Sequence, residues 1–381
     1  MIKLSSKLPD IGSTIFTEMS ALANEYNAIN LSQGFPNYPI DPVLSKLVQE
    51  AMNDGYNQYA PMAGSLDLRI AISNKYESLY KTTYHPDNEI TVTAGATQAI
   101  YTIISAFVHP GDEVVIFKPA YDCYQPAIEV NGGKCISMQL SAPNYTIDWQ
   151  ELERNLSSKT RMIIFNTPHN PSGTIWSQED IKELERLTSG TNIIVLSDEV
   201  YEHIIFDGEA HQSVCIHKEL KSRSFITASF GKTFHNTGWK IGYCCAPKEL
   251  MAEFRKVHQF NVFSVHHPSQ KGIADYMIDA STYNDLSSFF QRKRDLFLSL
   301  IADSRFKYTP SKGTYFQVLD YSAITDEGDV NFAKRLTKEK GIASIPLSVF
   351  NEDGRDDKVL RFCFAKTEDT LIKAAEVLNS I

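Results

Sequence analysis

The 381-residue sequence lacks the features that mark membrane, secreted and metal-binding proteins. No apolar run approaches the roughly 18 uninterrupted residues of a membrane-spanning helix. The first residues, MIKLSSKLPDIGS, contain no apolar core of the kind that signal peptides have. The ten histidines form no H-E-x-x-H pair and no other paired ligand spacing. We therefore expect a cytoplasmic protein without a bound metal.

Cysteine and positive charge are also scarce. The six cysteines form no C-x-x-C pair, so we predict reduced and mostly buried thiols. With 37 basic against 46 acidic residues the net charge is −9, which argues against a nucleic-acid-binding surface. The length predicts two or three structural units with a large core.

Six short apolar runs alternate with helical patterns from about residue 65 onward. The runs are rich in isoleucine and valine and are continuous rather than alternating, which is typical of strands buried on both faces of a parallel sheet. The segments 97–108 and 177–188 have helical periodicity, and the second opens with a serine cap and ends at Gly190. We predict an α/β domain with helices on both faces of its sheet. The expected strands are 89–95, 112–121, 134–140, 160–168, 191–200 and 223–230.

The pattern changes after about residue 247. A long helical stretch, 248–303 with breaks, leads to shorter strands and a last helix, which together predict a smaller α+β domain. An early helix, 14–26, lies far from the sheet in sequence, and we expect it to pack on this smaller domain. The expected strands are 313–322, 342–350 and 358–366, and the last helix is 367–381.

Polar side chains follow the ends of the predicted strands, at the edge where open parallel sheets bind ligands. Taken singly, each of these residues has an ordinary structural explanation: a common helix start, a core tyrosine, a turn asparagine or a surface lysine. Together they offer an anion cradle, an aromatic cover, an amide, a carboxylate, a phenol and an amine, which are the groups that pyridoxal 5′-phosphate (PLP) needs. In chain order they are Ala96 with Thr97, Tyr121, Asn170, Asp198 with Tyr201, and Ser229 with Lys232.

The sequence resembles the class I, fold-type I PLP-dependent aminotransferases along nearly its whole length. The motifs NLSQGFP, NQYAP, PAYDCYQPA, NTPHNPSG, SDEVYE, SFGKTFHNTGWKIGY and LRFCFAKTEDTL occur in the family's order. They are most similar to the branch that contains methionine aminotransferase and kynurenine–oxoglutarate transaminase. The resemblance implies a large PLP-binding domain, 39–269, with a mostly parallel seven-stranded sheet between helices. It also implies a small α+β domain, 270–381 with the N-terminal arm 1–38, and a homodimer with shared active sites.

The resemblance assigns cofactor roles to these residues. Lys232 would bond to the aldehyde of PLP and later move the proton between substrate and cofactor. Asp198 would pair with the ring nitrogen, Asn170 and Tyr201 would bond the 3′ oxygen, and Tyr121 would stack on the ring. The phosphate would meet Ala96, Thr97, Ser229 and Lys240, and Tyr59 would reach the phosphate in the neighbouring subunit.

Substrate recognition needs a cation for the α-carboxylate. The resemblance assigns this to Arg361, which lies amid apolar residues on a predicted strand, with help from Gly34 and Asn170. An internal ion pair for Arg361 remains an open alternative. The family's side-chain pocket corresponds to Phe16, Tyr59, Tyr121, Val265, His266 and Phe350, some from the partner chain, and a structural role for His266 also remains open.

An aromatic and uncharged pocket favours methionine, because thioether sulfur packs well on aromatic rings. Aromatic amino acids, glutamine and kynurenine are expected as further donors, since one methylene-sized difference discriminates weakly. The predicted reaction is ping-pong transamination between an amino acid and a 2-oxo acid. The alternative is a PLP-dependent β-lyase acting on cysteine conjugates or cystathionine. A PLP-sensing transcription regulator would need a DNA-binding domain, for which the sequence has no basic helix-turn-helix pattern.

Overall fold

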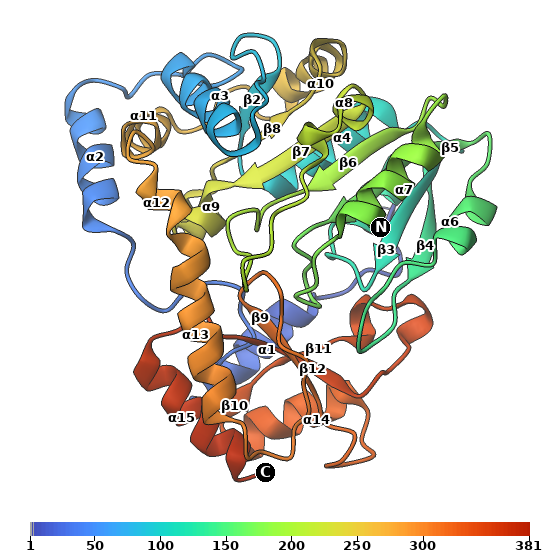
Figure 1. The fold of residues 1–381 in the computed structure, drawn as a ribbon, viewed down its shortest axis with the longest axis vertical. Helices are drawn as coiled ribbons and strands as arrows, with labels where there is room; N and C mark the ends of the chain where they lie inside the picture. The colour runs from blue at the N-terminus through green and yellow to red at the C-terminus, as the bar shows by residue number, and fades with distance from the viewer. Residues whose placement is uncertain (1, 3) are drawn as a thin grey trace.

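A seven-stranded sheet forms the centre of the larger part of the molecule (Figure 1). The structure is a computed structural model, and it describes residue 2 and residues 4–381. The strand order is β2-β8-β7-β6-β5-β3-β4, and β8 is antiparallel to both of its neighbours while the other pairs are parallel. The mostly parallel sheet is therefore confirmed. The strands are β2 (Ile90–Thr93), β3 (Glu113–Lys118), β4 (Lys134–Gln139), β5 (Thr160–Asn166), β6 (Ile194–Asp198), β7 (Ser224–Ser229) and β8 (Gly242–Cys245).

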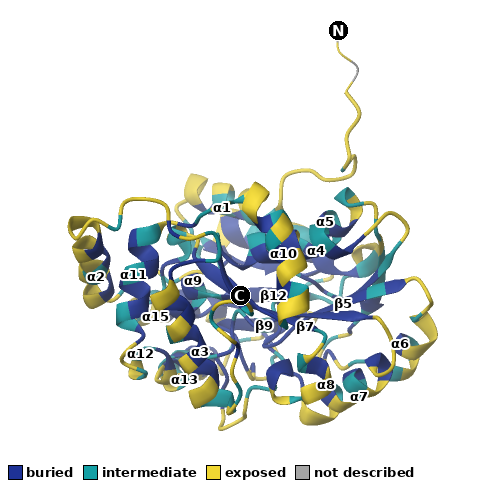
Figure 2. Ribbon diagram, turned by 90° about the horizontal axis from the view of Figure 1, so that it is seen from above, coloured by how far each residue is buried: buried dark blue, intermediate teal, exposed yellow. Residues whose placement is uncertain are grey.

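Helices cover both faces of this sheet, as Figure 2 shows from above. Successive residues of β3 point to opposite faces: Val114 and Ile116 join the core under α4, while Val115 and Phe117 join the core under α7. This double burial explains why the strands are continuous apolar runs. One face carries α4 (Ala96–Phe107), α5 (Tyr124–Val130) and α10 (Lys248–Asn261), and the other carries α3 (Leu66–Tyr80), α7 (Gln178–Thr188) and α8 (Lys218–Lys221).

The helix predicted over 177–188 begins and ends close to where the sequence places it. Helix α7 begins with a capping box between Ser177 and Asp180, and Gly190 just beyond its end has a φ of +71°, which a glycine adopts without strain. Helices α2 and α11 pack together beside the sheet. The other elements are α2 (Pro42–Asn53), α6 (Trp149–Asn155), η1 (Val214–Ile216), α9 (Phe230–Thr233), η2 (Thr237–Trp239), α11 (His267–Tyr276) and α12 (Ser281–Asn284).

The smaller part contains two small sheets with helices around them, and α13 (Leu286–Leu300) runs into it from the larger part (Figure 1). One sheet is antiparallel in the order β11-β12-β9, and in the other β1 pairs with β10 in parallel. Helix α1 packs against β10 and η3, as expected for the early helix. The elements are α1 (Ile15–Glu25), β1 (Ile29–Asn30), β9 (Phe316–Asp320), α14 (Asp329–Arg335), η3 (Leu336–Lys340), β10 (Ile342–Ala343), β11 (Ile345–Pro346), η4 (Ser348–Phe350), η5 (Glu352–Gly354), β12 (Val359–Cys363) and α15 (Glu368–Asn379).

The single strand expected over 342–350 is wrong. The chain pairs with β1 as β10, changes sheets at the buried Ser344, pairs with β12 as β11, and then turns into η4. Every residue from 342 to 348 is buried, so hydrophobicity alone does not reveal where the chain leaves one partner for another.

The division into a large domain 39–269 and a small domain 1–38 with 270–381 stays a prediction. Its second boundary falls inside the continuous helix α11, which packs on α2 of the larger part. We propose to place that boundary between α12 and α13. Among the described residues, no helix has the length and apolar character that crossing a bilayer requires.

Candidate active site

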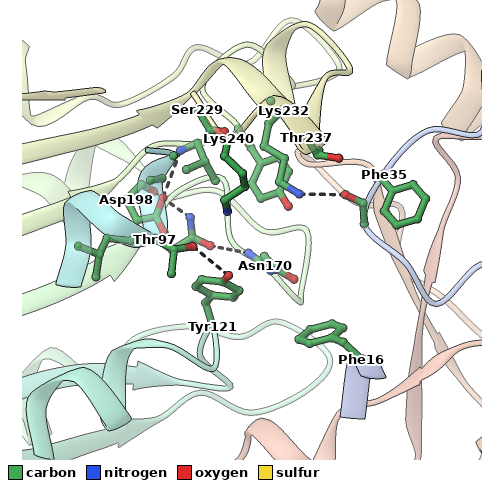
Figure 3. Close-up of a pocket in the computed structure, with 18 of the residues that line it drawn as sticks. Phe16, Phe35, Thr97, Tyr121, Asn170, Asp198, Ser229, Lys232, Thr237 and Lys240 are labelled. Atoms are coloured by element: carbon green, nitrogen blue, oxygen red, sulfur yellow. Dashed lines mark hydrogen bonds between the residues drawn. The ribbon is translucent and has the colours of Figure 1, made fainter. Parts of the chain in front are cut away.

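A cavity of about 250 Å³ lies between the strand ends of the large sheet and the smaller domain. The close-up in Figure 3 shows that its side chains converge from several strand ends and from the N-terminal helix. The structure brings twelve of the predicted site residues to this cavity: Phe16, Gly34, Ala96, Thr97, Tyr121, Asn170, Asp198, Tyr201, Ser229, Lys232, Lys240 and Arg361.

Lys232 points into the cavity from the short helix α9, which begins directly after β7. Its Nζ donates to the backbone carbonyl of Gly34 at 2.9 Å (Figure 3). Burial lowers the pKa of Lys232 to about 8, and the nearby Arg361 charge acts in the same direction. Within residues 4–381 no carboxylate lies at ion-pair distance from this amine. Lys232 is therefore a partly buried amine with a lowered pKa, which suits it to react as a nucleophile.

Asp198 ends β6 and is buried. Its Oδ2 accepts the hydroxyl of Tyr124 at 2.5 Å, and its Oδ1 accepts the backbone N–H of Val200 at 3.3 Å. Burial raises the pKa of Asp198 to about 6. No lysine, arginine or histidine of the described chain forms an ion pair with it, so the carboxylate is placed to receive a cationic group in the cavity.

Sequence reasoning missed two residues that support this carboxylate. Tyr124 follows Tyr121 by three residues in PAYDCYQPA, and the sequence alone does not distinguish it from a core aromatic. The Nδ2 of Asn166 donates to the backbone carbonyl of Asp198 at 2.8 Å, and its Oδ1 accepts the N–H of Asn170 at 2.7 Å. Asn166 thus fixes the loop that carries Asn170 to the strand that carries Asp198.

The start of helix α4 forms an anion cradle. No side chain caps this helix, and its first residues, Ala96 and Thr97, line the cavity, so uncapped N–H groups are available there. A Cβ added at Gly242 would lie 2.9 Å from the nitrogen of Ala96, so only glycine lets the helix start sit so close to β8. Lys240 lies beside Gly95, and its Nζ would be 3.4 Å from a Cβ built there. A lysine beside a free helix N-terminus suits a phosphate group.

Tyr121 is positioned at the same edge. Its hydroxyl lies 3.2 Å from Oγ1 of Thr97 on α4 (Figure 3). Burial raises the pKa of Tyr121 far above the neutral range, so it is a neutral aromatic group.

Arg361 reaches the cavity from β12 of the smaller domain and is 1% exposed. Its Nη1 donates to Oδ1 of Asn170 at 2.7 Å and its Nη2 donates to the carbonyl of Ser32 at 2.9 Å. The guanidinium lies 3.9 Å from the ring centre of Phe316. Both bonded acceptors are neutral, Nε has no partner, and no described carboxylate forms an ion pair with it. The internal ion pair is thus unsupported, and the arginine can still take a carboxylate.

Four predicted residues lie outside this cavity in the single chain. Tyr59, 80% exposed, lines a separate surface hollow with Val265 and His266. Phe350 packs behind Phe16, with ring centres 5.5 Å apart. His266 Nδ1 pairs with Oγ of Ser269 at 2.8 Å near the start of α11, which fits the structural role left open for it. The site roles of these four residues stay predictions.

Comparison with known proteins agrees with this geometry. The family of class I and II aminotransferases matches residues 26–378. The chain belongs to this family. It is 49% identical to methionine aminotransferase from Escherichia coli over 99% of this chain and 98% of that protein. It is 32% identical to kynurenine–oxoglutarate transaminase from Dictyostelium discoideum, covering 99% and 96%.

Solved structures give the same result. A crystal structure from Escherichia coli, described as having a methionine aminotransferase function, superposes with a TM-score of 0.98 at 48% identity and covers all of both chains. The fold type I architecture is confirmed, and the chain is an aminotransferase that acts on amino acids and 2-oxo acids. The relatives' names do not favour the β-lyase alternative.

The residues of this aminotransferase fit PLP. The partly buried amine of Lys232 and the buried carboxylate of Asp198 share one cavity without forming an ion pair with each other or with another charged group of the described chain. The uncapped start of α4 and Lys240 add an anion site at the same cavity. An aldehyde, a protonated ring nitrogen and a phosphate complement these three features.

Proposed function

We propose that this aminotransferase uses PLP to move the α-amino group of methionine to a 2-oxo acid by a ping-pong reaction. The observation that supports the proposal is the partly buried amine of Lys232, which has no ion-pair partner, in the same cavity as the buried carboxylate of Asp198, which also has none. When bound, PLP supplies an aldehyde that takes up the amino group and a ring that stabilises negative charge at the substrate Cα.

We assign each step of the reaction to a residue of this chain. Lys232 would hold the cofactor through its amine, and the same amine, when free, would accept the proton from the substrate Cα. Its lowered pKa makes the neutral, proton-accepting form accessible near neutral pH. Asp198 would keep the ring nitrogen protonated. Tyr201 and Asn170 would donate to the 3′ oxygen, and Tyr121 would cover the ring.

The phosphate is assigned to the N–H groups of Ala96 and Thr97, to Ser229 and to Lys240. Arg361 binds the substrate α-carboxylate as a two-pronged donor, with Gly34 and Asn170 beside it. Support comes from the neutral partners and unpartnered Nε of Arg361.

The substrate preference follows from the side-chain surroundings. Phe16 lines the cavity and is backed by Phe350, while Arg361 is the single arginine among the described lining residues. A second arginine for a dicarboxylic substrate is thus absent from that lining, and aromatic rings favour a thioether. Aromatic amino acids, glutamine and kynurenine are proposed as weaker donors.

The active unit is proposed to be a homodimer. Tyr59, Val265 and His266 lie together on a surface hollow of the single chain, as residues that serve a neighbouring subunit's site would. The expectation of a cytoplasmic location also stays a prediction.

A donor and acceptor panel tests the proposal. Purified holoenzyme is given methionine, phenylalanine, glutamine, kynurenine or aspartate with several 2-oxo acids, and both products are measured. Methionine should give the highest kcat/KM and aspartate the lowest. Release of pyruvate from a cysteine conjugate without any added 2-oxo acid would instead favour the β-lyase reaction.

A further inference from the structure

The turn that follows β6 presents two opposite faces. Asp198 and Tyr201 line the cavity, whereas Glu199 and Glu202 are buried outside its lining. The backbone fixes this alternation, because Glu199 N–H donates to the carbonyl of Thr227 on β7 and Glu202 N–H donates to the carbonyl of Glu199, both at 2.9 Å. A single short turn therefore joins two cavity residues to two buried carboxylates.

Glu199 is held by donors from two segments and is fully buried. Its Oε1 accepts the hydroxyls of Ser197 and Ser213 at 2.8 and 3.1 Å and the N–H of Val214 at 3.3 Å. Its Oε2 lies 2.7 Å from Nε2 of His211. Glu199 thus ties the end of β6 to the chain that enters η1.

Glu202 is held by α3 and β8. It forms a buried ion pair with Lys75, accepts the hydroxyl of Tyr80 at 2.9 Å and accepts that of Tyr243 at 3.2 Å. Lys75 also donates to the hydroxyl of Tyr243 at 2.6 Å. The imidazole of His203 lies 3.6 Å from Glu202, and burial lowers its pKa to about 3, so it adds no charge at neutral pH. Glu202 thus connects the turn to α3 and to the strand that follows Lys240.

Stability alone explains this arrangement poorly. Taking a lysine and a glutamate out of water has a large desolvation cost, and a buried ion pair is often matched or surpassed by well-packed apolar side chains. What such a network does provide is one fixed geometry, because each oxygen is held by named donors from separate elements.

We infer that Glu199 and Glu202 are positioning residues that hold the turn from behind, so that Asp198 and Tyr201 meet the cofactor in one orientation. The inference rests on the proposed function, because it assumes a cofactor ring in the cavity. Neither glutamate lines that cavity, and both act through the backbone they share with the two cavity residues.

The test compares two ways of loosening the turn with one matched control. Lys75→Met combined with Glu202→Leu removes both partners of the ion pair, so no lone charge is left buried. Glu199→Gln keeps an oxygen acceptor for Ser197 and Ser213. The control is Asp329→Asn, since Asp329 is a buried carboxylate of the smaller domain that accepts from Ser348 Oγ at 2.6 Å, away from the cavity.

Each holoenzyme is measured for its melting temperature, for kcat and KM with methionine, and for the visible absorbance of bound PLP as a function of pH. We expect both turn variants to lose about tenfold in kcat with less than about threefold change in KM, because misplacing a catalytic group affects the reaction more than binding. The pH midpoint of the cofactor absorbance should also move. Asp329→Asn should lower the melting temperature and leave kcat and the midpoint unchanged.

Three results would overturn the inference. Folded turn variants with the wild-type kcat and midpoint would overturn the inference, as would a control that loses kcat and shifts its midpoint as much as they do. If the double variant does not fold, the kcat and the pH midpoint of Glu199→Gln alone test the inference. A wild-type protein that binds no PLP or does not transaminate would defeat the proposed function itself, and the inference with it, before any variant is compared.

Discussion

Tyr124 donates its hydroxyl to Oδ2 of Asp198 at 2.5 Å, and this is the side-chain hydrogen bond that the described chain offers to that carboxylate. The bond favours the ionised form of Asp198 and so opposes the rise in pKa that burial causes. Tyr124→Phe should therefore raise the pKa of Asp198 and lower kcat/KM by about tenfold, since a hydrogen bond to a charged group contributes roughly 1.5–3 kcal/mol. The pH profile of kcat/KM checks this: its acidic limb should move to higher pH. An unmoved limb would show that the bond does not tune the carboxylate.

Asp198 should also destabilise the protein when PLP is absent. Its pKa is about 6 in the folded chain against an ordinary 3.8, so the folded state binds this proton more tightly than the unfolded state does. Ionisation between about pH 4 and pH 6 therefore lowers the free energy of unfolding, by about 3 kcal/mol at pH 7. In cofactor-free protein, Asp198→Asn should raise the melting temperature at pH 7 and change it little at pH 4. Equal melting temperatures at pH 7 would contradict the buried, unpaired carboxylate.

The attachment of PLP should depend on pH through Lys232. Burial lowers the pKa of Lys232 to about 8, and the neutral amine is the nucleophile. The rate at which cofactor-free protein acquires visible absorbance should thus rise up to about pH 8 and then level off. An ordinary lysine, with a pKa of 10.5, would keep accelerating toward pH 10. A small lysine analogue treated with PLP in parallel corrects for titration of the cofactor itself.

Arg361 should bind substrate rather than PLP. Arg361→Lys keeps the charge but loses the two-pronged geometry. We expect kcat/KM for methionine to fall by about a hundredfold, while the affinity for PLP stays within about twofold of wild type. Arg294→Lys is the matched control, because Arg294 is also buried but pairs with Asp207 outside the cavity. A large loss of PLP affinity in Arg361→Lys would place this arginine on the cofactor instead.

Tyr59 tests the shared active site. Tyr59→Phe should weaken PLP binding by about tenfold if its hydroxyl meets a phosphate. Co-expressed Tyr59→Phe and Lys232→Ala chains should form hybrid dimers with one intact site, because Lys232 comes from one chain and Tyr59 from the other. Wild-type PLP affinity at half the sites is the expected result. Hybrids in which every site binds weakly would show that Tyr59 acts within its own chain, and Tyr59→Phe homodimers with wild-type PLP affinity would show that its hydroxyl does not bind the cofactor.

Some site residues could be predicted from the sequence and others could not. Asp198 and Lys232 could be predicted because Asp198 ends one strand and Lys232 follows another by three residues. Both strands have a clear apolar pattern, and strand ends of a parallel sheet meet at one edge. Tyr124 could not be distinguished from a core aromatic, since the partner of its hydroxyl, Asp198, is 74 residues away in the sequence. Glu199 and Glu202 look like surface charges in the sequence, and only folding brings Lys75 and His211 to them.

Two other features depend on partners that a sequence does not display. The run 342–350 looks like one strand, and its division depends on pairing with β1 and β12 from distant parts of the chain. The site roles proposed for Tyr59 and Val265 require a second subunit, because in one chain these residues line a hollow apart from Lys232.

Reduction of the holoenzyme with borohydride, followed by peptide mass spectrometry, tests the central claim most directly. The reduced cofactor should be found on Lys232, in a one-to-one ratio with the chain, and Lys232→Ala should carry no label. A label on another lysine such as Lys240, or wild-type protein that acquires none, would contradict the account.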